Sequence, residues 1–354
     1  MSAPALITSH PLKSPEPEPV RASVIAARVV GLLVCVGVLI LVVLTSISVG
    51  AKPIPLPDVV NALFAGQGTA DGVVILDLRV PRTLLGLAVG AALAVAGVLM
   101  QALTRNPLAD PGILGVNIGA SVAVVLAIWL LNLGSLSSYV WFAFVGAAAA
   151  SVLVYLLGSA GREGATPVRL ALAGTAISAV LGSVVSFVTI LNPQVFDQFR
   201  FWGVGALAGV QPEIFGQVLP FLLFGVLLAL GLSGALNALA LGDDMARALG
   251  SRIGLTRVLG ALAVTLLCGA ATAAVGPIGF IGLTVPHMAR LITGPDHRWL
   301  MPYSLVLGPI LLLGADILGR VVARPGEIQA GIITAVVGAP VFIALVRRRR
   351  IAEL

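Results

Sequence analysis

The sequence predicts an all-α polytopic membrane protein, and three observations indicate that fold class. Of its 354 residues, 58% are apolar and only 10% are charged, and the mean hydropathy is +1.08. A soluble domain carries about 25% charged residues, so a fold surrounded by water is excluded. The apolar runs are continuous, which excludes the alternating strand pattern of a membrane β-barrel.

About ten apolar runs have the length of roughly 17–25 residues that a helix needs to cross a bilayer. They lie at roughly 28–49, 82–103, 112–132, 138–158, 168–191, 214–238, 257–275, 277–292, 300–318 and 328–346. An even number of spans places both termini on one side. With the termini in the cytoplasm, fifteen of the 21 lysines and arginines fall on the inner side, as the positive-inside rule favours. Gly276-Pro277 joins two spans almost without a loop, so we expect protein rather than lipid around it.

The ends of the chain differ in composition from the apolar body. Residues 1–27 are rich in proline, serine and glutamate, which predicts a disordered cytoplasmic tail. The apolar run Val29–Val49 is longer than the roughly 7–15 residues of a signal peptide core, so we expect it to be retained as the first span. Residues 28–346 form the predicted membrane domain. Residues 347–354 begin with four arginines and form a basic cytoplasmic C-terminus.

The sequence shows no pattern typical of a catalytic, metal or nucleotide site. Neither of its two lysines, Lys13 and Lys52, lies in a glycine-rich phosphate-binding loop. The three histidines are too scattered for a metal site. An ion-coupled carrier needs ionisable groups at bilayer depth, and the nearest, Asp316, is expected to pair with Arg320 one turn later. We therefore expect a protein that is not an enzyme, binds no cofactor of its own and takes its energy from elsewhere.

Small residues form an uninterrupted i, i+4 row in the predicted span 168–191: Gly174, Ser178, Gly182 and Ser186. Such residues let helix backbones approach closely and hydrogen-bond across the contact. Two interpretations stay open. The row is either a packing surface between helices or a mildly polar wall along a translocation path.

The inner loop 239–257 is predicted to contain a short helix. Asp243 and Asp244 fall in its first turn, where the helix dipole favours acids, and Gly250 is the expected C-terminal stop. Asp243 is placed to pair with Arg247 at i, i+4. The helix would expose three apolar side chains: Met245, Ala246 and Leu249. It is either an ordinary amphipathic surface helix or a docking element for a cytoplasmic motor.

Several motifs occur in the order found in one transport family. Arg79-Val-Pro-Arg82, Asn106-Pro-Leu-Ala-Asp-Pro111 and Leu114-Gly115 resemble the R-x-P-R…NPLA-x-P-x-x-LG signature of the FecCD-type permeases. Further matching segments are Gly276-Pro-Ile-Gly-Phe-Ile-Gly-Leu283, Val285-Pro-His-Met-Ala-Arg290 and Gly338-Ala-Pro340. The resemblance covers nearly everything after residue 28. These permeases are the membrane subunits of ABC importers for iron–siderophores, haem and vitamin B12.

The resemblance implies a vitamin B12 importer-like, type II ABC importer fold in the bacterial cytoplasmic membrane. It also implies a second permease subunit, identical or paralogous, two cytoplasmic ATP-binding subunits that hold ATP and Mg²⁺, and an extracytoplasmic siderophore-binding protein. Three outer arginines would meet carboxylates of that binding protein: Arg79, Arg82 and Arg320. Residues of the loop 239–257 would form the coupling contact with the ATPase: Gly242, Asp243, Ala246, Leu249 and Gly250. The spans 168–191 and 328–346 would line the translocation path.

The cargo expected from the resemblance is an iron(III)–siderophore complex, because Arg324-Pro-Gly-Glu327 is more similar to the ferric-siderophore branch than to the B12 branch. Haem and vitamin B12 are the alternatives within the family. An ion-coupled secondary carrier and a passive channel are the alternatives outside it. The chain departs from the family's Glu-Leu-Pro-x-Gly motif at Glu327-Ile-Gln-Ala-Gly331, and no gate residues are assigned.

Overall fold

The computed structural model describes residues 20–50, 54–65, 70–160 and 167–347, which are almost entirely helical. The first helix, α1 (Val20–Ser48), begins earlier than predicted, so residues 20–27 are helical rather than disordered. No proline or glycine follows Pro19 until Gly31, and nothing in that stretch interrupts a helix. The rest of the predicted tail, 1–19, and the residues 348–354 lie outside the described residues.

Ten long helices coincide with the ten predicted spans. They are α1, α4 (Val80–Thr104), α5 (Val116–Leu131), α6 (Leu136–Ser159), α7 (Pro167–Leu191), α9 (Pro212–Ala240), α11 (Ile253–Val275), α12 (Ile281–Thr293), α13 (His297–Val322) and α14 (Ala330–Arg347). Within the described residues, seven segments are long and apolar enough to cross a membrane, and α5 and α14 contribute shorter apolar helices. The all-α polytopic fold predicted from the sequence is confirmed.

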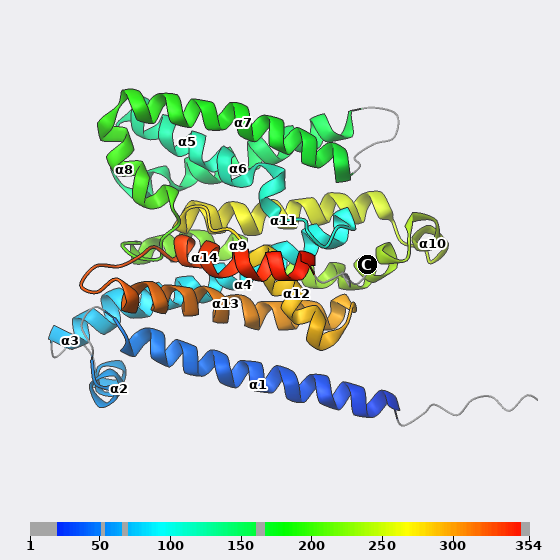
Figure 1. Cartoon of the computed structure of the whole chain (residues 1–354), viewed down its shortest axis with the longest axis horizontal. Helices are drawn as coiled ribbons and strands as arrows, with labels where there is room; N and C mark the ends of the chain where they lie inside the picture. Colours follow the sequence, from blue (N-terminus) through cyan, green and yellow to red (C-terminus); the bar gives the residue numbers. More distant parts are fainter. Residues whose placement is uncertain (1–19, 51–53, 66–69, 161–166, 348–354) are drawn as a thin grey trace, which may run out of the picture.

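Short elements connect the long helices at the two ends of the bundle. They are α2 (Leu56–Ala65), α3 (Ala70–Val73), the π-helical η1 (Val74–Arg79), the 3-10 helix η2 (Pro111–Leu114), α8 (Pro193–Gly203) and α10 (Asp243–Ala248). Figure 1 shows α2, α3 and α8 at one end, named here the α8 end. The opposite end, named the α10 end, carries α10, the beginning of α1 and the end of α14. The first and last described helices thus meet the same end, as an even number of spans requires.

Helix α4 forms the centre of the bundle and α1 its rim. In the most apolar window of each helix, 78% of α4 is buried inside the protein but only 11% of α1. Glycines let α4 cross its neighbours closely. A Cβ on Gly97 would collide with the carbonyl of Gly282, and one on Gly90 would lie 2.7 Å from the Cα of Pro309. The rim position of α1 leaves many of its apolar side chains exposed on the surface of the bundle.

The predicted span 277–292 is partly irregular, because α12 begins only at Ile281. Gly276 has a φ of 77°, and a Cβ there would collide with the carbonyl of Trp202. The N–H of Ala206 donates to the Val275 carbonyl at 2.8 Å. Protein therefore surrounds this turn, as expected of non-helical backbone at membrane depth.

Candidate functional site

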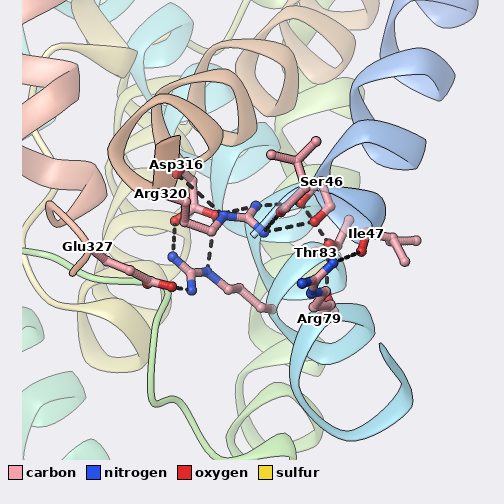
Figure 2. Close-up of polar contacts among 9 residues, drawn as sticks. Ser46, Ile47, Arg79, Thr83, Asp316, Arg320 and Glu327 are labelled. Atoms are coloured by element: carbon pink, nitrogen blue, oxygen red, sulfur yellow. Dashed lines mark hydrogen bonds and ion pairs between the residues drawn. The ribbon is translucent and has the colours of Figure 1, made fainter. Parts of the chain in front are cut away.

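At the α8 end, Arg320 of α13 is almost completely buried, with 2% of its surface exposed. Its guanidinium donates to the carbonyls of Ser46 and Val49, each at 2.8 Å, and to Ser46 Oγ at 2.9 Å. It also pairs with Asp316 at 2.8 Å, which confirms the predicted i, i+4 pair. Figure 2 shows this cluster between α1, α4 and α13.

Arg82, near the start of α4, is a second partner of Asp316. Its Nε and Nη2 atoms donate to the two carboxylate oxygens at 3.1 and 2.7 Å, and its Nη1 donates to Glu327 at 2.8 Å. The side chain of Asp316 is 1% exposed and that of Glu327 is 32% exposed. One buried carboxylate is thus shared by two arginines, and a half-exposed carboxylate extends the network to the segment before α14 (Figure 2).

Arg79, the last residue of η1, completes the cluster. Its Nη1 atom donates to the carbonyls of Ile47 and Ser48 at 2.8 and 2.6 Å. The last carbonyls of a helix have no partner within that helix. Arg79 and Arg320 therefore cap the C-terminal end of α1, and Arg324 adds a bond to the Gly50 carbonyl at 3.0 Å.

The three arginines predicted to meet a binding protein do lie together at one end of the bundle. However, Arg79 and Arg320 are only 6% and 2% exposed, and their guanidinium groups bind this chain. Arg82, in contrast, borders an open cavity. The sequence showed where these residues sit along the spans, but it gave no signal that the end of α1 would bind two of them.

The cavity beside Arg82 has a volume of about 380 Å³ and opens at the α8 end. Charged groups line one part of it and aromatic side chains another: Arg82, Asp316, Glu327, Tyr139, Phe201 and Trp202. Helix α8, which supplies the last two, was not predicted. Its signals were Pro193 in the first turn and the buried pair Val195 and Trp202 seven residues apart.

At the α10 end, the predicted short helix is present as α10, and Gly250 ends it as expected. Gly250 has a φ of 80°. The N–H of Gly250 bonds to the Arg247 carbonyl and the N–H of Ser251 to the Ala246 carbonyl, each at 2.9 Å, which is a Schellman motif. Gly242, with a φ of 105°, supplies the sharp turn before α10.

Two details of the predicted helix are wrong. Ala246 is fully buried against Leu239 and Ile253, because α10 folds back onto the bundle, whereas Met245 and Leu249 are 54% and 61% exposed as predicted. Asp243 does not pair with Arg247.

The carboxylate of Asp243 faces the bundle, and this orientation gives it two other partners. Arg247 pairs with Asp244 at 3.1 Å, while Asp243 binds Arg105 and Arg257. Arg105 and Arg257 also line a cavity of about 120 Å³ between α4, α6, α7 and α11. Sequence reasoning missed both residues. The available signal was one arginine at the inner end of a predicted span and another at the start of the span that follows Asp243 by 14 residues; nothing in the sequence links Arg105 to Asp243.

At the same end, a polar contact joins α9 to α13. Asp296 caps α13 by accepting from the Arg298 N–H at 3.0 Å, and it accepts from Asn237 Nδ2 at 2.6 Å. Partial burial opposes the charged form of Asp296, but these two hydrogen bonds and the charges of nearby arginines outweigh it. The pKa of Asp296 is consequently lowered from its ordinary value.

The small-residue row of α7 does not form one exposed stripe. Gly174 is buried, and a Cβ there would collide with the carbonyl of Ile113 in η2, so this glycine allows helix packing. Ser178 and Gly182 are half-buried, and Ser186 is exposed. The structure therefore assigns the row to packing at Gly174, and its lining of a path stays a prediction for the other three residues.

No group of three or more histidine, cysteine, aspartate or glutamate side chains able to hold a metal occurs among the described residues.

The family model described as the FecCD transport family matches residues 38–348. The chain is 50% identical over 313 residues to the ferric enterobactin transport system permease protein FepD of Escherichia coli K12, covering 88% of this chain and 93% of that one. It is 44% identical to the Fe(3+)-citrate import system permease protein YfmD of Bacillus subtilis 168, covering 86% and 90%.

A solved structure has the same fold. It is described as an inward-facing ABC transporter of metal-chelate type, and it matches with a TM-score of 0.78 at 28% identity, over 90% of this chain and 98% of that one. The motifs, the helical bundle and these matches agree along nearly the whole sequence. The chain belongs to the FecCD transport family.

Proposed function

We propose that this chain is the permease subunit of an ABC importer in a bacterial cytoplasmic membrane and that it carries an iron(III)–siderophore complex. The observation that carries the proposal is the 50% identity, over 88% of the chain, to a ferric enterobactin permease. The agreement of fold with a metal-chelate type ABC transporter supports it.

The energy for transport is supplied by two cytoplasmic ATP-binding subunits, which hold the ATP and Mg²⁺. This assignment is supported by the lack of a phosphate-binding loop in the sequence and by three exposed apolar side chains around α10: Leu241, Met245 and Leu249. The α10 end is then the cytoplasmic end, and both termini lie in the cytoplasm. The excess of lysine and arginine on that side supports the same orientation.

The α8 end faces the extracytoplasmic binding protein. Arg82 and Glu327, which border the cavity of about 380 Å³, form part of the docking surface. Arg79 and Arg320 support that surface from below by fixing the end of α1.

A second permease subunit, identical or paralogous, faces α7 and α14, and the cargo passes between the two. The low burial of α7 within this chain, 17% of its most apolar window, supports this contact; Ser186 is exposed, and Ser178 and Gly182 are half-buried. This arrangement gives alternating access powered by partner subunits.

The test is uptake by bacterial cells that lack their own siderophore permeases and express this chain with its ATP-binding subunits and binding protein. The labelled cargoes are ferric enterobactin, ferric citrate, a ferric hydroxamate, haemin and vitamin B12. We expect uptake of at least one ferric siderophore, abolished by an inactive ATP-binding subunit. Uptake of haemin or vitamin B12 alone would overturn the cargo assignment, and uptake that ignores the inactive subunit would overturn the ABC mechanism.

A further inference from the structure

One carboxylate at the α10 end joins α10 to α11 and to the end of α4, and one of its arginine partners also binds α9. Asp243, the first residue of α10, accepts from Arg257 Nη2 through both oxygens, at 3.2 and 3.1 Å, and from Arg105 Nη2. Arg257 lies in the first turns of α11, and Arg105 ends α4. Arg105 Nε also donates to the Leu239 carbonyl at the end of α9, at 3.1 Å. The side chains of Arg105 and Arg257 are each 37% exposed. The cluster of Asp243, Arg105 and Arg257, named here the joint, therefore lies at the surface of the bundle.

The backbone of Arg105 is a second observation that points to the same joint. Arg105 is left-handed, with φ 48° and ψ 35°, a region that glycine prefers. Its N–H bonds to the Ala102 carbonyl and the N–H of Asn106 to the Gln101 carbonyl, the same pattern that Gly250 forms at the end of α10. An arginine is thus held where a glycine fits better, and its side chain makes the contacts to α9 and α10. Backbone strain of this kind is typical of functional positions.

The two acidic residues of α10 face opposite ways. Asp243 and the buried Ala246 lie on the side that packs against the bundle. Asp244 is fully exposed, and within the described part of the chain its ion-pair partner is the exposed Arg247 on the same helix, at 3.1 Å. Asp244 therefore offers a neighbour of the same charge that is not part of the joint.

Helix α4 continues from this joint to the α8 end as one uninterrupted helix. Its 25 residues span about 37 Å at 1.5 Å per residue. Close glycine contacts with α12 and α13 fix it in the core, and Arg82 at its far end binds Asp316 and Glu327. A displacement of α10 that is carried through Arg105 would therefore reach the end of the bundle that carries the cavity.

We propose that Arg105 and Arg257 are positioning residues that hold α10 through Asp243, so that movement of α10 drives α4 and α11 together. This inference rests on the proposed function, because it assumes that an ATP-binding subunit moves α10. Asp243 then acts inside the permease, transmitting movement, instead of contacting the ATPase.

The test uses the full complex of permease, ATP-binding subunits and binding protein in proteoliposomes and measures cargo transported per ATP hydrolysed. We expect Asp243→Asn, Arg257→Gln and Arg105→Gly to lower this ratio at least about fivefold, the lower range of measured coupling between sites. The amount of assembled complex and its ATP hydrolysis should persist. Asp243→Glu should restore most of the ratio, and Asp244→Asn, the matched control, should leave it within about twofold because exposed pairs contribute little.

Arg105→Gly keeps the inference testable if Asp243→Asn fails to fold, because glycine fits the left-handed backbone of position 105. A folded Arg105→Gly complex with the wild-type ratio would overturn the inference. So would an Asp243→Asn complex that matches Asp244→Asn. If the wild-type complex itself shows no ATP-driven uptake, the proposed function fails, and that result is distinct from failure of the joint.

Discussion

The two ends of α4 use arginine in different ways. At the α8 end, Arg320 is 2% exposed, and it and Arg82 share the buried Asp316. At the α10 end, Arg105 and Arg257 are each 37% exposed and share the half-buried Asp243. Burial fixes the first cluster around the end of α1, whereas the second cluster lies at the surface of the bundle. The residue type is the same, so the surroundings decide the role.

Arg320→Met should have the largest effect on stability, since it removes one member of a buried ion pair and leaves the carbonyls of Ser46 and Val49 without their donor. Breaking such a pair costs about 3–5 kcal/mol. The melting temperature of the purified protein in detergent measures this loss of stability. The control is Arg200→Met, whose side chain is 49% exposed and pairs with Asp197 at 3.4 Å. Equal melting temperatures for the two variants would show that the buried cluster at the α8 end does not stabilise the protein.

Gly97→Ala should have the second largest effect on stability, because α4 packs closely against α12 at this glycine. A Cβ at this position meets the backbone of Gly282, and overpacking of this kind costs about 1–3 kcal/mol. Gly37→Ala on α1 is the control, since nothing lies within 4 Å of its Cβ. The same unfolding assay compares them, and a harmless Gly97→Ala would mean that α4 and α12 are not tightly packed.

Glu327→Gln should have a smaller effect than Asp316→Asn, although both carboxylates bind Arg82. Glu327 is 32% exposed and contributes at most about 1 kcal/mol, whereas Asp316 is 1% exposed, and its loss leaves the buried Arg320 without its ion-pair partner and Arg82 with Glu327 as its remaining acidic partner. Unfolding temperatures of the two single variants test this distinction between buried and exposed contacts. A lower unfolding temperature for Glu327→Gln than for Asp316→Asn would contradict it.

Arg105→Gly should have the smallest effect on stability. The half-exposed ion pair is worth about 0–1 kcal/mol. Glycine adopts the left-handed conformation without the steric cost that arginine has there, and this gain in stability is of roughly the same size as the loss of the ion pair. We expect a melting temperature close to that of the wild type. A strong loss of stability would place Arg105 in the same class as Arg320 and remove the contrast between the two ends.

Local signals made much of the fold predictable. Continuous apolar runs located the ten long helices, and Gly250 located the end of α10. Features that depend on distant segments were missed. The capping of α1 by Arg79 and Arg320 and the burial of Ala246 arise from contacts between residues far apart in the sequence. The irregular start of the span at 277 depends likewise on the backbone around Trp202.

The most direct test of the account is accumulation of a labelled ferric siderophore in proteoliposomes that contain this permease. Vesicles are made with or without the ATP-binding subunits, with ATP on the side of α10 and the loaded binding protein on the side of α8. The account predicts accumulation against a gradient only when the ATP-binding subunits and ATP are both present. Accumulation by the permease alone, driven by an ion gradient, would contradict it.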